Sequence, residues 1–99
     1  MRAIHYAPLD KLRPAVVLTR SRAVGRLPTV TVAAITSTIR HLATEVLVDE
    51  SNGLPHLSVI NLDNVYTIRY ERLGRHLGYL HPEQESRLHA ALIRAFGLD

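Results

Sequence analysis

The sequence predicts a mainly β protein, a small β-barrel with one α-helix packed on it at the C-terminus. Five or six short apolar segments, rich in β-branched residues and separated by turn residues, have the length of strands. The last segment instead repeats its apolar residues with the period of a helix. At 99 residues the chain has room for one hydrophobic core, so we predict a single domain over residues 1–99.

Three strands are expected in the first half of the chain. Residues 3–6 form a short apolar segment that the sequence APLD stops, and residues 15–19 form the continuous apolar run of a buried strand. Glycine and proline mark residues 21–28 as a loop. Residues 29–35 then alternate between two sets of side chains, which indicates a third strand with one face on the core.

The second half contains the remaining strands. Residues 44–48 form the fourth strand, and Asn52-Gly53 is a strong turn signal directly after it. Residues 58–62 form the fifth strand, which leads into the sequence DNVYTI. The sequence RYERLGRH has room for one helical turn before a last short strand at residues 77–80.

The C-terminal segment has the start, stop and spacing of a helix. Pro82 suits a first helical position, and Glu83 and Glu85 complement the positive end of the helix dipole. Gly97 suits the position just past the helix end. The residues of the apolar face follow a spacing of three, one, three and one: Leu88, Ala91, Leu92, Ala95 and Phe96.

The basic charge is almost entirely arginine. Lys and Arg total 12 against 9 acidic residues, and Lys11 is the only lysine. The guanidinium group pairs with phosphate through two hydrogen bonds and stacks on bases, so the bias favours a nucleic-acid partner. Arginine codon preference in a GC-rich genome explains the same bias equally well.

Several classes of site and location are not expected. Without cysteine, neither a disulfide framework nor a thiolate metal site is possible. The six histidines contain no pair at a metal-ligand spacing, so we expect surface or turn histidines and no metal site. His41 and His56 fall in loops near the site described next. The first residues lack the apolar region of a signal peptide and no stretch approaches ~18 apolar residues, which predicts a cytoplasmic protein without membrane association.

Polar side chains cluster where three of the strands begin or end. Arg13 directly precedes a strand, and Pro14 restricts its backbone to extended geometry, so the guanidinium is aimed with little freedom. Thr36 follows another strand and opens a run of three hydroxyls. Each cluster taken singly suits a structural role: a solvated arginine, a capping threonine, a turn. The accompanying polar residues are Ser37, Thr38 and Arg40, and Asn61, Asp63 and Asn64 at the end of the fifth strand.

Taken together, four segments resemble the MazF/PemK (Kid) family of toxin endoribonucleases. The segments are RPAVVLTR, TVAAITSTIR, SVINLDNVYTI and LGYLHPEQESRLHAAL, which stand in the family's order over nearly the whole chain. The resemblance implies an SH3-like β-barrel that forms a homodimer and cleaves single-stranded RNA without a metal or other cofactor. It also implies the toxin role of a type II toxin–antitoxin system, inhibition of translation, and a MazE-like antitoxin as partner.

The resemblance also implies roles for individual residues. Arg13 and Thr36 match the arginine and threonine that the family uses for catalysis, and Asp63 matches an acidic residue with an acid–base role in some members. Asn61 stands where some members carry a further arginine, and the connection APLDKL is shorter than in many relatives. The residues expected to contact RNA are Arg20, Ser37, Thr38, Arg40, Asn61, Asn64 and Arg69.

The chemistry expected of such a site follows from the substrate. RNA carries its own nucleophile, the 2′-OH, so the products would be a 2′,3′-cyclic phosphate and a 5′-OH. A guanidinium can contact two phosphate oxygens and binds more strongly as charge develops on them. Thr36 can donate to a phosphate oxygen or orient the 2′-OH, but its hydroxyl is a poor base. Proton transfer is left to Asp63, Arg13 or the substrate itself.

Two other classes of function remain open from the sequence. A CcdB-like toxin that binds DNA gyrase without enzymatic activity would share the barrel, although the C-terminal RAFGLD does not resemble that class's aromatic end. A non-enzymatic SH3-like interaction module is the third. The RNA sequence recognised, and whether the target is messenger, ribosomal or transfer RNA, depend on loops that the sequence does not place.

Overall fold

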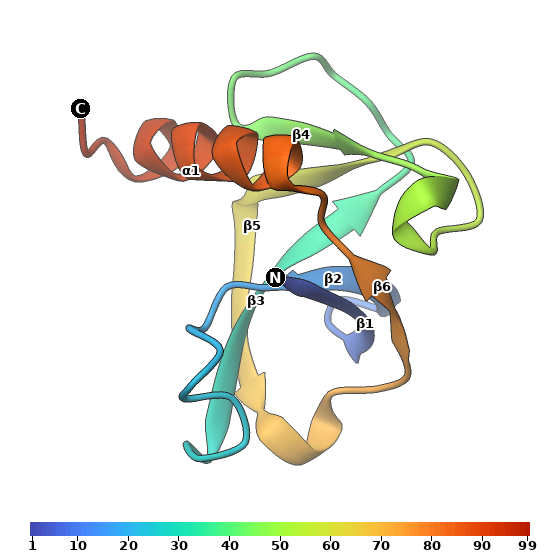
Figure 1. Ribbon diagram of the computed structural model, residues 1–99, viewed down its shortest axis with the longest axis vertical. Helices are drawn as coiled ribbons and strands as arrows, with labels where there is room; N and C mark the ends of the chain where they lie inside the picture. The colour runs from blue at the N-terminus through green and yellow to red at the C-terminus, as the bar shows by residue number, and fades with distance from the viewer.

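A computed structural model describes the whole chain, residues 1–99, as one curled sheet with a single α-helix (Figure 1). All neighbouring strands are antiparallel, in the order β4-β5-β3-β2-β1-β6. The elements are β1 (Ala3–Pro8), β2 (Leu12–Val17), β3 (Thr29–Thr36), β4 (Glu45–Val48), the 3₁₀ turn η1 (Glu50–Asn52), β5 (Ser58–Arg69), the 3₁₀ turn η2 (Tyr70–Arg72), β6 (His76–Tyr79) and α1 (Pro82–Phe96).

The predicted fold class is confirmed, and the differences concern strand ends. β2 begins at Leu12 rather than at residue 15, because Leu12 and Arg13 pair with Pro8 and Ala7 of β1. β5 continues through the sequence DNVYTI to Arg69, because β3 offers pairing partners along this whole stretch. The helical turn expected within RYERLGRH is η2.

Each face of the sheet carries its own hydrophobic core. Alternate residues of a strand point to opposite faces, so Val16, Ala33 and Ile35 join the cluster beneath α1, which also contains Leu88. Their neighbours in the chain form a smaller cluster on the other face. The members of this second core are small, being Ala7, Ala15, Val17, Val30 and Val32. The functional site lies at one end of this second face.

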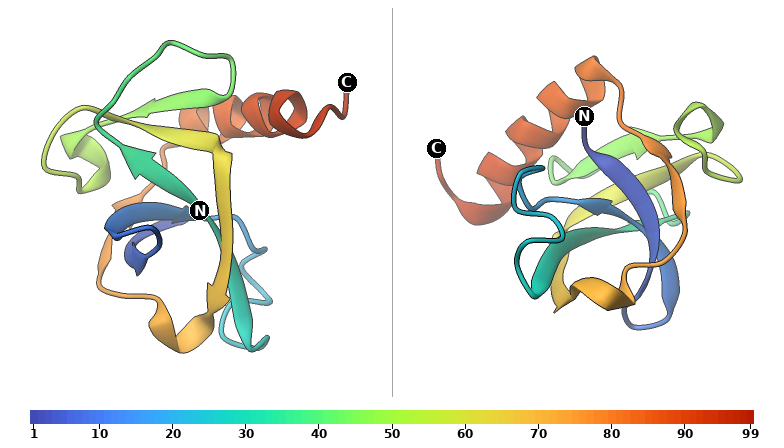
Figure 2. Two further views of the ribbon diagram at one scale, coloured as in Figure 1. Left: turned by 180° about the vertical axis from the view of Figure 1, so that it is seen from behind. Right: turned by 60° about the horizontal axis from the view of Figure 1, so that its bottom comes forward.

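The helix α1 forms as its sequence predicts, except at its last turn. Gly97 adopts a φ of 63°, and Leu98 N–H donates to the Ile93 carbonyl at 2.9 Å, which ends the helix. Leu88 and Ala91 are buried, but Phe96 is 56% exposed. The helix contacts β4 and β5, Leu92 and Ala95 also pack against the larger core, and the C-terminal end of the helix extends past the sheet (Figures 1 and 2).

The barrel is closed by a turn instead of by hydrogen bonds between the edge strands β4 and β6. The η1 turn packs on β6 so tightly that a Cβ on Gly78 would stand 2.1 Å from the Asn52 carbonyl oxygen. Asn52 is fully buried and donates to the Tyr79 carbonyl at 2.9 Å and to the Gln84 side-chain oxygen at 2.7 Å. Gln84 in turn donates to the Leu47 carbonyl at 3.2 Å. These two amides therefore fasten η1, β6 and α1 to one another.

Candidate active site

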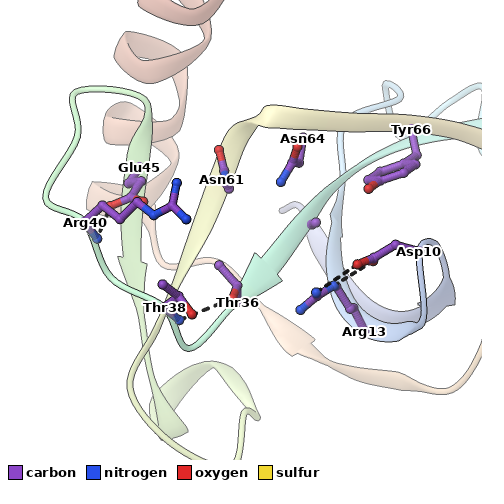
Figure 3. Close-up of a pocket in the computed structure, with 10 residues that line it drawn as sticks. Asp10, Arg13, Thr36, Thr38, Arg40, Glu45, Asn61, Asn64 and Tyr66 are labelled. Atoms are coloured by element: carbon purple, nitrogen blue, oxygen red, sulfur yellow. Dashed lines mark hydrogen bonds and ion pairs between the residues drawn. The ribbon is translucent and has the colours of Figure 1, made fainter.

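Strand pairing brings Arg13 and Thr36 to the same end of the second sheet face. Ala15 of β2 pairs with Ala34 of β3, and continuing this antiparallel register by two residues sets Arg13 opposite Thr36. Both side chains line one pocket of about 220 Å³, which we call the amide pocket (Figure 3). The residues that line it are Asp10, Arg13, Ala34, Thr36, Thr38, Arg40, Glu45, Asn61, Asn64 and Tyr66.

A bulge in β5 supplies the two amides of this pocket. The register between β3 and β5 shifts from Ala33↔Val65 to Ile35↔Ile60, so four residues of β5 face Ala34 alone. Asn61 and Asn64 therefore both point into the pocket from either side of the bend (Figure 3). The Asn61 side-chain oxygen accepts from the Asp63 N–H at 2.9 Å, which directs its NH₂ group away from the bulge backbone.

The Arg13 guanidinium is held by a carboxylate that the sequence did not single out. Nε donates to Asp10 Oδ1 at 2.7 Å and Nη2 donates to Oδ2 at 2.9 Å. These hydrogen bonds lower the pKa of Asp10 to about 2, so Asp10 is a carboxylate at neutral pH. The same contact raises the pKa of Arg13. One edge of the Arg13 guanidinium is thus occupied by Asp10. The two N–H groups of Nη1 and the second N–H of Nη2 remain available to a ligand.

The Thr36 hydroxyl is oriented by its own turn. Its Oγ1 accepts from the Thr38 backbone N–H at 3.2 Å (Figure 3). Because this bond uses the oxygen as an acceptor, the hydroxyl hydrogen is free to be donated. A phosphate oxygen, which only accepts hydrogen bonds, is a suitable recipient.

The loop after β3 is tied back across the pocket by Glu45. Its Oε1 accepts from the backbone N–H groups of Arg40 at 3.0 Å and Leu42 at 3.3 Å. His41, between them, has a φ of 57°, the left-handed conformation uncommon for a residue other than glycine. The clamp sets Arg40 on the wall facing Arg13. With two arginines and two carboxylates, the formal charges of the pocket cancel, so an anion there meets directed N–H groups instead of a net positive field.

Three of the sequence-predicted residues line neither the amide pocket nor the cavity that adjoins it. Asp63 is exposed on the bulge, and its Oδ2 accepts from the Thr44 hydroxyl at 2.7 Å. Arg69 forms an ion pair with Glu71 and pairs in the sheet with Thr29, at the end of β3 opposite to Thr36. At ~3.3 Å per residue, these two ends of β3 are about 23 Å apart. Arg20 follows the far end of β2 and lines a separate cavity with Arg22, Ala23, Arg26 and Leu27.

The remaining predicted residues are brought together, and others join them. Thr38, Arg40, Asn61 and Asn64 line the amide pocket, and Ser37 lines a cavity adjoining it. The residues that sequence reasoning missed are Asp10, Glu45 and Tyr66. No three His, Cys, Asp or Glu side chains gather at a spacing that would hold a metal ion, and no helix is long and apolar enough to span a membrane.

The chain thus combines a curled antiparallel sheet and a C-terminal helix with a polar pocket that an arginine and a threonine share. The sequence profile of the PemK-like, MazF-like toxins of type II toxin–antitoxin systems matches residues 6–96. The chain belongs to this family.

Individual relatives agree with this assignment. The chain is 52% identical to Endoribonuclease MazF3 of Mycobacterium tuberculosis H37Rv, over its whole length and 96% of the relative. The structure of the M. tuberculosis toxin MazF-mt6 superposes with a TM-score of 0.95 at 52% identity, over 99% of both chains. An endoribonuclease solved with its cognate antitoxin, from a mycobacterial species, shares the fold at 24% identity with a TM-score of 0.87, over 98% of this chain and 93% of that one.

Proposed function

We propose that the protein is an endoribonuclease toxin that cleaves single-stranded RNA by attack of a ribose 2′-OH on the neighbouring phosphate, without a metal, and so inhibits translation. Family membership and 52% identity to a protein named endoribonuclease support this activity. The observation that carries the mechanism is the shared pocket of Arg13 and Thr36.

Arg13 stabilises the charge that develops on the phosphate. The guanidinium edge left free by Asp10 presents N–H groups from Nη1 and Nη2, which suit two phosphate oxygens at once. These bonds strengthen as the pentacoordinate transition state accumulates charge. Thr36 adds one further donor, because its oxygen is already engaged by Thr38 N–H.

Asp10 acts as a positioning residue for Arg13. Its two oxygens fix the rotation of the guanidinium plane, so the free edge needs no reorganisation when the substrate binds. A carboxylate whose pKa is lowered to about 2 is also a weak base toward a 2′-OH.

We do not assign the acid–base role to Asp63, because its carboxylate lies outside the pocket and is bound by the Thr44 hydroxyl. Of the three groups considered for proton transfer, Arg13 and the substrate's own phosphate oxygens remain.

The amide pocket is suited to bind a base next to the phosphate. Asn61 and Asn64 carry amide donors and acceptors of the kind that pair with base edges, and Tyr66 offers an aromatic ring. Thr38, Arg40 and, in the adjoining cavity, Ser37 add polar contacts. We do not include Arg20 and Arg69 in this site, since both lie toward the other end of the sheet.

We further propose that the protein forms a homodimer and binds a MazE-like antitoxin. Solved complexes of family toxins with antitoxins support such a partner. Large hydrophobic side chains exposed near the site offer apolar surface for either contact, among them Leu12, Leu42, Leu47 and Leu57, each at least 45% exposed. No observation favours a gyrase-binding, non-enzymatic toxin.

The test is incubation of purified protein with end-labelled single-stranded RNA in excess EDTA. Wild type is expected to cut, while Arg13→Ala is expected to lose at least ~100-fold in rate, the usual cost of one transition-state donor. Thr36→Val, which keeps the shape of the side chain, is expected to lose activity as well. Circular dichroism of each variant serves as the folding control. Cutting by Arg13→Ala at the wild-type rate would refute the site assignment.

A further inference from the structure

A second cavity meets the amide pocket at the two proposed catalytic side chains. This cavity, the His56 pocket, has a volume of about 210 Å³ and is lined in part by Arg13 and Thr36. Leu12, Pro14, Ile35 and Pro55 give it apolar walls, and Ser37 and His56 stand among its polar groups. Both pockets are smaller than the about 300 Å³ at which sites for drug-sized ligands begin, so each suits a single nucleobase.

The two pockets take their walls from opposite faces of the sheet. Ala34 and Tyr66 of the amide pocket belong to the face of the smaller core, since Tyr66 pairs with Val32. Pro14 and Ile35 of the His56 pocket alternate with Arg13 and Thr36 and belong to the face beneath α1. Arg13 and Thr36, at the ends of β2 and β3, therefore stand on the rim between the two faces.

Such a rim meets a geometric requirement of the cleavage reaction. The 2′-oxygen, the phosphorus and the leaving 5′-oxygen must be nearly in line for attack, and regular stacking of neighbouring nucleotides holds them out of line. Parting the two bases rotates the backbone between them and allows the alignment. A protein surface with one base pocket on each side of a phosphate site stabilises that parted conformation.

We propose that the His56 pocket binds the nucleotide on one side of the scissile phosphate while the amide pocket binds the nucleotide on the other, with the two bases splayed across the sheet rim. This inference rests on the proposed ribonuclease function and adds a second base subsite to it. It assigns to His56 and Ser37 a role in base selection.

His56 has one ring nitrogen available for such a contact. Its Nδ1 lies 3.2 Å from the Leu57 carbonyl oxygen and 3.4 Å from Ser58 Oγ, and the tautomer with the hydrogen on Nδ1 can donate to that carbonyl, which can only accept. In this tautomer Nε2 is an acceptor, and the hydrogen bonds of the imidazole within the protein involve only Nδ1. An exocyclic amino group of adenine or cytosine is the complementary partner. The exposed imidazole at the pocket edge is thus suited to form a hydrogen bond with a base.

The first experiment is cleavage of a single-stranded RNA library, randomised around the cut, in EDTA with sequencing of the new ends. We expect His56→Ala to relax the base preference about fivefold at one nucleotide flanking the cut, the effect of one hydrogen bond. Asn64→Ala is expected to relax the preference at the nucleotide on the opposite side. His89→Ala, on the exposed face of α1, is the matched control and should leave both preferences unchanged.

The second experiment requires no variant. An RNA with a 2′-deoxyribose at the scissile position and a photoreactive base on either side is cross-linked to the wild-type protein. Mass spectrometry should locate one cross-link within residues 55–58 or at Leu12, and the other within residues 61–66.

Both cross-links in one pocket, or relaxation by both variants on the same side, would overturn the splayed arrangement. Unchanged preferences in His56→Ala would overturn the subsite while leaving the ribonuclease intact. A wild-type protein that cuts no RNA would instead refute the ribonuclease, and the subsite with it.

Discussion

Replacing Arg13 with lysine keeps the positive charge but removes the planar guanidinium group and its N–H donors on three nitrogens. Arginine has five N–H groups on three nitrogens. Asp10 takes one from Nε and one from Nη2, at 2.7 and 2.9 Å, and three remain on the opposite edge. Lysine has three N–H groups on one nitrogen, and Asp10 lies beside that nitrogen's position. The ammonium would therefore pair with Asp10 and offer the phosphate at most a single-point contact.

The expected result is a loss of ~100- to 1,000-fold in kcat, the effect of removing one preorganised transition-state donor. KM should change much less, because the positive charge that attracts the RNA is retained. Initial rates on a fluorogenic single-stranded RNA, at several concentrations, give both constants. Arg72→Lys, an exposed site in η2 away from the pocket, should behave as wild type.

A double-mutant cycle tests whether Asp10 works through Arg13. Asp10→Ala alone is expected to lower kcat about tenfold by releasing the guanidinium. In the Arg13→Lys background, Asp10→Ala should have little further effect on kcat, because the guanidinium group that Asp10 orients is no longer present. A kcat within tenfold of wild type for Arg13→Lys would refute the claim that catalysis needs a guanidinium that contacts two phosphate oxygens. Full additivity in the cycle would show that Asp10 acts independently.

Three further predictions concern stability and pH. Asn52→Ala is expected to lower the free energy of unfolding by about 3 kcal/mol, because it leaves Gln84 and the Tyr79 carbonyl without partners in a buried position. Urea denaturation measures this change, and a loss below about 1 kcal/mol would show that water replaces the amide. Gly78→Ala should destabilise the fold at least as strongly as Asn52→Ala does, because its Cβ would stand 2.1 Å from the Asn52 carbonyl oxygen. The thermal midpoint measures this, and an unchanged midpoint would mean that η1 is not packed on β6. The pKa of Asp10 in the folded protein is about 2, below its ordinary 3.8. Its pairing with Arg13 therefore stabilises the fold fully above pH 3.8, and this effect is lost as the pH falls toward 2. NMR titration of the carboxyl carbon should give the low pKa, and a midpoint near 4 would show that the ion pair is absent in solution.

The elements that the sequence predicts well are those set by local pattern. The alternation of Val30 and Val32 with threonine and alanine places one face of β3 on the smaller core, and the spacing from Leu88 to Ala91 places α1 on the larger one. Both patterns are periodic over several residues, so one side chain out of place does not obscure them. Phe96 belongs to the same apolar periodicity but is exposed, because periodicity alone does not show that the helix continues beyond the edge of the sheet on which it packs.

Asn61 and Asn64 were expected at the site, but the geometry that brings them together depends on pairing between distant segments. Asn61 and Asn64 cannot share a face of a regular strand, being three residues apart, and the bulge that brings both into the pocket exists only opposite Ala34. The same bulge carries Asp63 out of the pocket, although in sequence it stands between them.

Asp10 had a sequence signal, an acid three residues before Arg13 in a turn. That spacing predicts an ion pair on a helix, and nothing local shows that a turn between β1 and β2 would bring the two side chains together as well.

Cleavage of an RNA carrying one 2′-deoxyribose at the scissile nucleotide tests the central claim most directly, with analysis of the ends formed on the unmodified RNA. Intact deoxy substrate, together with a 2′,3′-cyclic phosphate and a 5′-OH from the ribose form, is the predicted result. Cutting of the deoxy substrate, or a 3′-OH end, would contradict attack by the ribose at the Arg13–Thr36 pocket.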